Sequence, residues 1–171
     1  MKHIFTILLI GLSMGLQSQS TVVFSKVTAS WCPNCGTWGW GFMENMKAQY
    51  ANDEKAIVLG VHYSGDLETP TAKWFANNLN SVGQPQFYVN NERVSVGSSS
   101  WQAKAEEVKE TIDNFSADSY SEFKFDNAFI NANGMIEANI TFNPISEAPT
   151  NDVYFGLYIF ENNVSNFQAG L

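Results

Sequence analysis

The residues best suited to chemistry are two cysteines, Cys32 and Cys35, separated by a Pro-Asn spacer directly after Trp31. At the start of a helix, a two-residue spacer lets both sulfurs approach bonding distance, and the helix N-terminus stabilises the first thiolate. This pattern predicts Cys32 as the nucleophile and Cys35 as the resolving thiol. Cys32 would attack a substrate disulfide, and Cys35 would then attack the resulting mixed disulfide.

A second candidate for the site is Pro85, which lies in the segment Val82-Gly83-Gln84-Pro85. This segment falls between a predicted helix and a predicted strand. An X–Pro bond in such a tight turn is a candidate for the cis form. His62 ends an apolar strand run, where open α/β sheets place their sites, and an imidazolium there would lower the pKa of a nearby thiol. A hydrogen-bonded histidine at the end of a strand is the alternative interpretation.

The elements that must position these residues alternate between strands and helices up to about residue 116. The predicted strands are Thr21–Ala29, Ala56–Tyr63, Gln86–Val89 and Arg93–Val96, the last two joined by a turn at Asn90-Asn91. The composition of Ala56–Tyr63 is typical of a strand buried on both faces. Two helices are predicted at Met43–Tyr50 and from Pro70 to about Ser81. A third begins after Ser100, which is a suitable N-cap. The apolar face of this third helix consists of Trp101, Ala105, Val108, Ile112 and Phe115. Gly36, Gly39 and Gly41 weaken the segment before the first of these helices.

The pattern changes to strands alone after Phe115. Ser119–Ala132, Met135–Phe142 and Val153–Phe160 are predicted strands, and Asn133-Gly134 predicts a type I′ turn between the first two. Consecutive strands without a helix indicate a separate antiparallel unit. The predicted organisation is a signal peptide at 1–20, an α/β domain at 21–116, and the start of a truncated, β-sandwich-like domain at 117–171.

The first twenty residues resemble a secretory signal peptide. Lys2 and His3 precede the apolar stretch Ile4–Leu16, and small side chains flank a predicted cleavage point after Ser20. The apolar stretch is shorter than the ~20 residues that a spanning helix needs, so a membrane anchor is the weaker interpretation. No later stretch is long enough, so no transmembrane segment is expected after the signal is removed. Outside the cytosol, a close cysteine pair can persist as a disulfide.

The composition excludes several classes of protein. Hydrophobic residues make up 44% and charged residues 15%, which rules out a disordered acidic tail. The net charge is −8 and the sequence contains no run of Lys or Arg, so the chain lacks the cluster of basic residues that nucleic-acid-binding proteins use. Two cysteines exclude a multi-disulfide mini-protein. No glycine-rich phosphate loop or nucleophilic serine motif is present, and we expect no cofactor.

The order of these motifs resembles the thioredoxin superfamily over Thr21–Phe115: Trp-Cys-x-x-Cys after a strand, then Val-Gly-x-Pro before another strand. The resemblance implies a thioredoxin-like domain with a central mixed sheet flanked by helices. In that family the loop proline is cis and lies against the cysteines, and the residue before it binds substrate backbone. The resemblance therefore assigns catalysis to Cys32 and Cys35, and substrate binding to Trp31, Gln84 and Pro85.

A narrower resemblance is to the outer-membrane-protein-28-related family, whose exported bacterial members carry a thioredoxin-like domain followed by a β-rich domain. It rests on the segments 28–35, 60–66, 83–85 and 90–93, together with Tyr154–Gly170. The resemblance implies a secreted protein located in the periplasm, in the outer membrane or at the cell surface. It implies little about activity.

Three positions depart from these families. Lys26 stands where thioredoxins carry a buried acid for proton transfer to the resolving thiol, which makes Lys26 and His62 candidate second-shell residues. The Pro-Asn spacer is neither the Gly-Pro of strong reductants nor the Pro-His of strong oxidants, so the motif assigns no direction of electron flow. Gly36 stands where the narrower family often has proline.

Three functions compete at this stage. The first is an exported thiol–disulfide oxidoreductase that acts on protein thiols and disulfides. The second is a non-enzymatic envelope or surface protein in which a Cys32–Cys35 disulfide is structural; Lys26 and the β-rich continuation favour it. The third is capture of Cu(I) or Zn²⁺ by Cys32, Cys35 and His62, for which only two thiolates and one imidazole are available.

Overall fold

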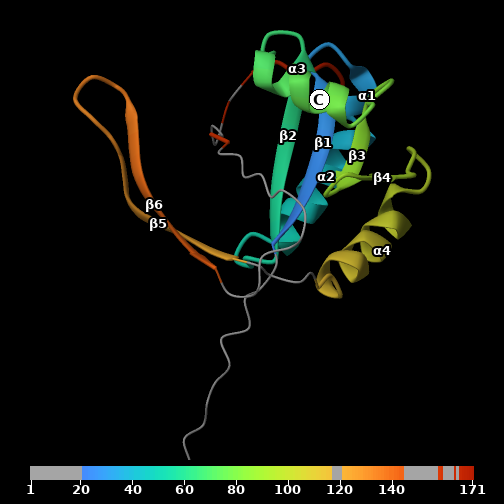
Figure 1. The fold of residues 1–171 in the computed structure, drawn as a ribbon. Helices are drawn as coiled ribbons and strands as arrows, with labels where there is room; N and C mark the ends of the chain where they lie inside the picture. The colour runs from blue at the N-terminus through green and yellow to red at the C-terminus, as the bar shows by residue number, and fades with distance from the viewer. Residues whose placement is uncertain (1–20, 117–120, 145–157, 160–163, 165) are drawn as a thin grey trace, which may run out of the picture.

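The computed structural model of the 171-residue chain describes residues 21–116, 121–144, 158–159, 164 and 166–171. The predicted signal peptide at 1–20 and most of the predicted strand Val153–Phe160 lie outside these residues. Two sheets are described: a four-stranded mixed sheet and a two-stranded antiparallel sheet. The predicted fold class is confirmed, because a central mixed sheet flanked by helices is followed by an antiparallel β unit (Figure 1).

The mixed sheet has the strand order β2-β1-β3-β4. Its central strand β1 pairs in parallel with β2, and antiparallel with β3, which in turn pairs antiparallel with β4. The strands are β1 (Val22–Ala29), β2 (Ala56–Ser64), β3 (Gln86–Val89) and β4 (Glu92–Val94). The parallel pair needs a crossover connection, and helices α1 (Pro33–Gly36) and α2 (Trp38–Gln49) provide it.

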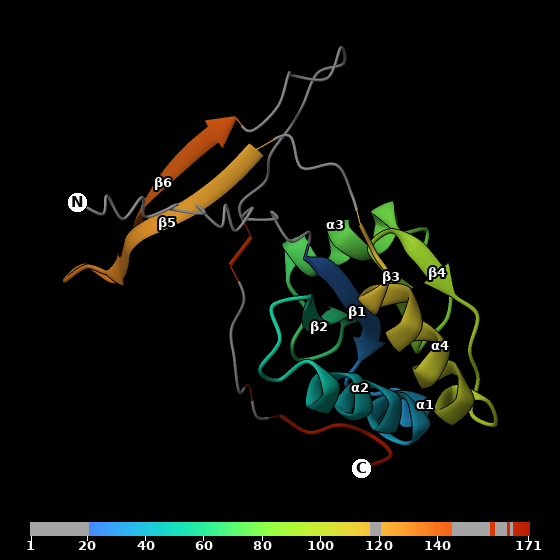
Figure 2. The same ribbon diagram turned by 90° about the horizontal axis from the view of Figure 1, so that it is seen from below.

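Helices cover both faces of this sheet, as the two views in Figures 1 and 2 show. Helices α2 and α4 (Trp101–Asp113) pack on one face, and α3 (Pro70–Asn78) packs on the other. Successive residues of β1 point to opposite faces, so Phe24 enters the core beneath α2 and α4 and Val27 enters the core beneath α3. Phe42 anchors the larger core, with ring centroids 5.4 Å from Phe24 and 4.6 Å from Phe87.

Most predicted elements of this domain are present, but several details differ. Helix α3 ends at Asn78 rather than near Ser81, and Phe115, predicted on the apolar face of α4, lies beyond the end of that helix and is 38% exposed. Strand β2 is partly exposed rather than buried on both faces, because it forms an edge of the sheet. Helix α2 begins at Trp38, five residues before the predicted start at Met43. Ser100 precedes α4 but makes no side-chain cap: its Oγ accepts from the backbone N–H of Gly97 at 3.1 Å instead.

The two-stranded sheet consists of β5 (Ser121–Ile130) and β6 (Ile136–Pro144). The predicted hairpin is present, but its turn is not type I′, which needs positive φ at both central residues. Only Gly134 has a positive φ, of 76°, and Asn133 does not. The side-chain oxygen of Asn131 closes the loop by accepting from the N–H groups of Asn133 and Met135.

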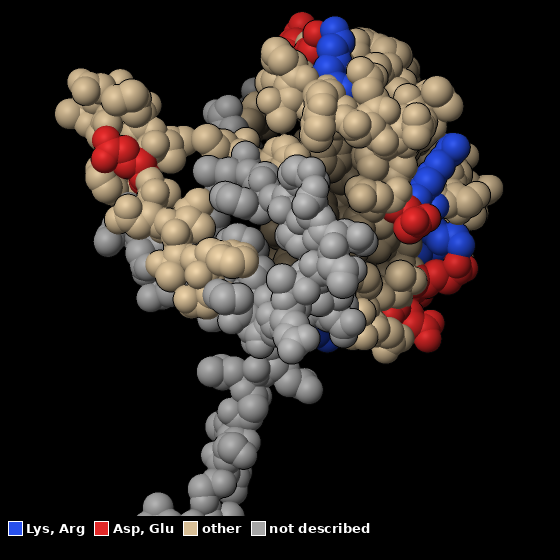
Figure 3. All heavy atoms as spheres, in the orientation of Figure 1, with Lys and Arg blue, Asp and Glu red and all other residues tan. Residues whose placement is uncertain are grey.

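In Figure 3 charged side chains gather on the side of the molecule where α4 lies, and a further red and blue group lies at its top. Ion pairs on α4 join Lys104 to Glu107 and Lys109 to Asp113. Across the ranges that the structure describes, no helix combines the length and apolar character needed to cross a bilayer.

Candidate active site

The Cys32–Cys35 pair lies where β1 passes into α1, and the two residues form a disulfide with Cα atoms 5.3 Å apart. Cys32 is the N-cap residue of α1, and Pro33 takes the first helical position, where its fixed φ is favourable and its missing N–H costs nothing. The backbone N–H of Cys35 donates to Sγ of Cys32 at 3.2 Å. The local sequence therefore places a hydrogen-bond donor on the sulfur that was predicted to be the nucleophile.

Both sulfurs are poorly accessible in this oxidised state. Cys32 is 4% exposed and Cys35 is fully buried. They form a small apolar cluster with Ala29, and the half-buried Tyr63 packs against it. Access to Cys32 therefore requires a movement of the surrounding chain.

Pro85 approaches the same region from β3. The Gln84–Pro85 bond is cis, as the sequence indicated, and both residues are half-buried. Gly39 marks where the proline meets α2: a Cβ there would lie 2.8 Å from Cγ of Pro85 and 3.0 Å from the carbonyl oxygen of Asn34. The proline ring and the Pro-Asn spacer thus converge on Gly39, and the absence of a side chain at this position permits their approach.

Trp31 forms the exposed rim of the site. It is 54% exposed, and its Nε1 donates to Oγ of Ser64, the last residue of β2, at 3.1 Å. Trp38, the next tryptophan along the chain, instead packs against the core ring of Phe87, with the two ring centroids 5.9 Å apart. Trp31 therefore presents the large apolar surface beside the cysteines.

Lys26 is a buried amine beneath the cysteine loop. Its side chain extends from β1 toward α1 and α2, and the residue is 2% exposed. Nζ donates to the carbonyl of Cys35 at 2.9 Å and lies 5.3 Å from the ring centroid of Trp40. Burial lowers the pKa of Lys26 to about 8, against a smaller opposing effect of Glu44. This amine can therefore change protonation state near pH 8 while it contacts the backbone of Cys35.

His62 lies on the same face of the sheet as Lys26. It pairs in register with Thr28, two residues along β1 from Lys26. Burial lowers the pKa of His62, and the charge of Lys26 lowers it further. Its buried Nδ1 has no hydrogen-bond partner among the described residues. At neutral pH the imidazole is therefore uncharged, and it does not supply the positive charge that would stabilise a thiolate.

The structure adds one residue that sequence reasoning missed. Gln168 is 8% exposed and lies against the cysteine loop, with its side-chain amide donating to the carbonyl of Cys32 at 3.1 Å. No local motif around Gln168 marks it, because its partners precede it by more than a hundred residues.

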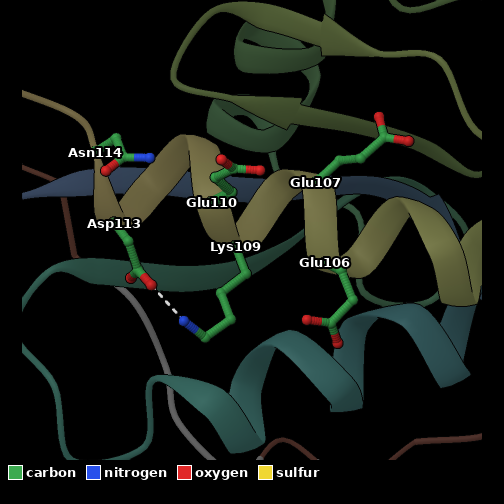
Figure 4. A pocket seen from close by; sticks show the side chains of 6 residues that line it. All are labelled: Glu106, Glu107, Lys109, Glu110, Asp113 and Asn114. Atoms are coloured by element: carbon green, nitrogen blue, oxygen red, sulfur yellow. Dashed lines mark hydrogen bonds and ion pairs between the residues drawn. The ribbon is translucent and has the colours of Figure 1, made fainter.

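A separate hollow along α4 involves none of these residues (Figure 4). Its lining comes from α4 and the residue that caps it: Glu106, Glu107, Lys109, Glu110, Asp113 and Asn114. The side chains point outward from one helix, and Lys109 pairs with Asp113. Within the described part of the chain, no three His, Cys, Asp or Glu side chains are grouped so that they could hold a metal ion.

Comparison of the chain with models of protein families, with curated proteins and with solved structures found no match. Of the residues singled out in the sequence, the structure gathers the two cysteines, Trp31 and Lys26 at the end of β1. Pro85 reaches the same loop through Gly39, and His62 lies on the neighbouring strand. What this site can do follows from these residues rather than from the fold alone.

Proposed function

We propose that this protein is an exported thiol–disulfide oxidoreductase of thioredoxin-like type that acts on protein disulfides through Cys32 and Cys35. The observation that carries the proposal is the disulfide at the junction of β1 and α1, with the cis Gln84–Pro85 turn packed against the same loop. The family resemblance of the motifs supports it and implies a location in the periplasm, in the outer membrane or at the cell surface.

In the reducing direction, the Cys32 thiolate attacks one sulfur of a substrate disulfide. A Cys32–substrate bond forms, the substrate S–S bond breaks, and the leaving sulfur takes up a proton. The Cys35 thiolate then attacks Cys32, the Cys32–Cys35 bond forms, and the second substrate sulfur leaves and is protonated. Two electrons and two protons reach the substrate. The N–H of Cys35, which contacts Cys32 Sγ, stabilises the attacking thiolate.

Lys26 is proposed to assist the second attack. Its Nζ contacts the carbonyl of Cys35, the residue whose thiol must lose a proton in that step. Below a pH of about 8 the ammonium form stabilises a nearby thiolate, and above it the free amine can accept a proton. Lys26 thus takes the place that a buried acid occupies in the families that the sequence resembles, with the opposite charge.

The proposed substrate is an extended polypeptide that contacts Trp31 and the Gln84–Pro85 turn. Trp31 offers exposed apolar surface, and its indole is fixed in place by its bond to Ser64. The half-buried Gln84 precedes the cis proline, from where its backbone would bind that of the substrate.

The test is disulfide exchange with a protein substrate, followed for wild type, Cys32→Ser and Cys35→Ser. We expect Cys32→Ser to reduce exchange to the background level. Cys35→Ser should instead accumulate a covalent complex, because the mixed disulfide forms but is not resolved. Unchanged turnover in Cys32→Ser would overturn the proposal.

The burial of both cysteines favours a second function, a non-enzymatic envelope or surface protein with a structural Cys32–Cys35 bridge. The two functions differ in how readily the disulfide is reduced in the folded protein. A bridge that resists excess dithiothreitol under native conditions supports the structural role. Rapid reduction, followed by alkylation at Cys32, supports the oxidoreductase.

A further inference from the structure

The segment from Asn166 to Leu171 lies against the loop that carries the cysteines. It passes beside α1 in the red part of the ribbon in Figure 2. Phe167 is 72% exposed and Leu171 is 73% exposed, so burial of large apolar side chains does not hold this segment in place. Polar and backbone contacts to the cysteine loop hold it instead, and they centre on Gln168.

The side-chain amide of Gln168 lies in a ring of carbonyl groups. Its Nε2 is 3.1 Å from each of the carbonyl oxygens of Ala29, Ser30 and Cys32, and 3.3 Å from that of Ala169. An NH₂ group donates two hydrogens, which these acceptors share. The Gln168 amide therefore ties together the backbone on both sides of Trp31, from the end of β1 to the nucleophilic cysteine.

The backbone of the segment fits the loop equally closely. The N–H of Ala169 donates to the carbonyl of Ser30 at 2.8 Å. A Cβ at Gly36 would overlap the carbonyl of Ala169, and a Cβ at Gly170 would overlap the carbonyl of Pro33. The contact thus requires a glycine in each partner: Gly36 in α1 and Gly170 in the segment Asn166–Leu171.

We infer that Asn166–Leu171 is an internal clamp that restricts access to the Cys32–Cys35 disulfide, with Gln168 as its positioning residue. The clamp fixes the carbonyls of Ala29, Ser30 and Cys32, and Cys32 is 4% exposed while it is in place. A dithiol or a substrate thiolate must reach a sulfur in line with the S–S bond, which requires this loop to move. That the clamp regulates an oxidoreductase rests on the proposed function. That it restricts access of thiols to the Cys32–Cys35 disulfide does not.

Releasing the clamp from the side of Gln168 gives the first test. Gln168→Glu keeps the size of the side chain but replaces its donor amide by a carboxylate that faces several carbonyl oxygens. Gln102→Glu makes the same change at an exposed position of α4 and is the matched control. The measurement is the second-order rate constant for reduction of the protein disulfide by dithiothreitol, read by alkylation and mass spectrometry. We expect about a tenfold increase for Gln168→Glu and none for Gln102→Glu.

A second variant displaces the clamp without altering Gln168. Gly170 has a φ of 92°, and a Cβ there would overlap the carbonyl of Pro33. Gly134 has a φ of 76°, but a Cβ there would meet nothing within 4 Å. Gly170→Ala and Gly134→Ala therefore carry comparable backbone strain, and only the first affects the clamp. Gly170→Ala should accelerate reduction several-fold, and Gly134→Ala should leave it unchanged.

Far-UV circular dichroism and urea unfolding of the oxidised proteins confirm that each variant compared is folded during the reaction. Faster reduction in either clamp variant, relative to its folded control, supports the clamp. Equal or slower reduction in the clamp variants that fold overturns it. Because dithiothreitol acts on the protein's own disulfide, this result is independent of protein-substrate turnover: a clamp can be present in an inactive protein, and an active protein can lack one.

Discussion

The two best-defined lysine environments in this molecule differ in the sign of their pKa shift. Lys26 lies beneath the cysteine loop and is 2% exposed, and burial lowers its pKa to about 8. Lys109 lies on the outer side of α4, and its hydrogen bond to Asp113 raises its pKa. The Lys26 ammonium has a carbonyl as its hydrogen-bond acceptor, whereas the Lys109 ammonium has a carboxylate.

The Lys26 amine can lose its proton near pH 8 and could take part in proton transfer, whereas the Lys109 amine stays charged at the surface. A carbonyl oxygen does not neutralise an ammonium ion, so the buried Lys26 costs stability whenever it is charged. The exposed pair on α4 costs little and contributes little, because water screens it. A costly buried charge next to a reactive pair is the pattern expected of a functional site.

The largest expected effect is that of Lys26→Met, which keeps the length of the side chain but removes the charge. A pKa lowered from 10.5 to about 8 corresponds to about 3 kcal/mol, from which the lost hydrogen bond to Cys35 subtracts about 1 kcal/mol. We therefore expect the variant to be more stable than wild type by about 2 kcal/mol at pH 7, measured by urea unfolding of the oxidised proteins.

The pH dependence identifies the cause of this gain. Between pH 8 and 10.5 unfolded wild type binds more protons than folded wild type, so wild-type stability rises with pH across this window. The advantage of Lys26→Met should therefore shrink as the pH rises from 8 to 10.5. Lys47→Met, at an exposed position of α2, is the control and should show neither effect. A destabilised Lys26→Met would contradict the interpretation.

A smaller effect is expected for Tyr50→Phe, which probes a partly buried hydrogen bond to Asp113 of α4. Tyr50 is 7% exposed, and its hydroxyl lies 3.2 Å from Oδ1 of Asp113 and 3.3 Å from the carbonyl of Lys109. Removing this hydroxyl should lower the free energy of unfolding by about 1 kcal/mol. An unchanged urea midpoint would mean that the hydroxyl contributes nothing net.

His62→Gln should change the pH dependence of the free energy of unfolding, by less than the effect expected for Tyr50→Phe. The pKa of His62 is lowered by burial and by Lys26, so folded wild type favours the neutral imidazole. As the pH falls below 6.5, the unfolded chain takes up a proton first and wild-type stability decreases. Unfolding measured from pH 8 to 5 should show that this decrease is weaker in His62→Gln. If the free energies of unfolding of the two proteins change in parallel with pH, His62 does not cause the loss of stability at low pH.

The smallest effect is expected for Lys109→Met, which breaks the exposed pair with Asp113. Screening by water leaves such pairs with little net contribution. Thermal unfolding at low and at high salt should show no measurable difference from wild type. A clear, salt-sensitive loss of stability would show that the Lys109–Asp113 pair contributes to stability, against the expected contrast with the buried charge of Lys26.

Much of the α/β domain is predictable from local sequence. The β-branched and aromatic residues of the segment that ends at Ala29 specify the central strand, and Pro85 and Asn90 mark turns by their own chemistry. The cysteine pair follows from its spacing and from its place between a strand and a helix. These features share one property: the residues that specify them are close to one another in the chain.

The rest of the site depends on long-range contacts that leave no local pattern. Gly36 and Gly39 weaken a helix by propensity, but they are the points where Ala169 and Pro85 approach the cysteine loop. Lys26 was recognised only as a departure from the family pattern, and its contact with Cys35 needed the structure. Gln168 lies in a short segment without a recognisable motif, and its role depends on the carbonyl groups of Ala29 and Cys32 that it contacts.

The sequence distance between Cys32 and Gln168, 136 residues, also has a consequence for biosynthesis. The strands and helices that surround the cysteines are complete by Asp113, well before Gln168 is added to the nascent chain. At typical translation rates, the 55 residues from Asp113 to Gln168 take roughly 3 to 11 seconds to synthesise. The α/β domain can therefore form around the cysteines before the contacts of Gln168 exist.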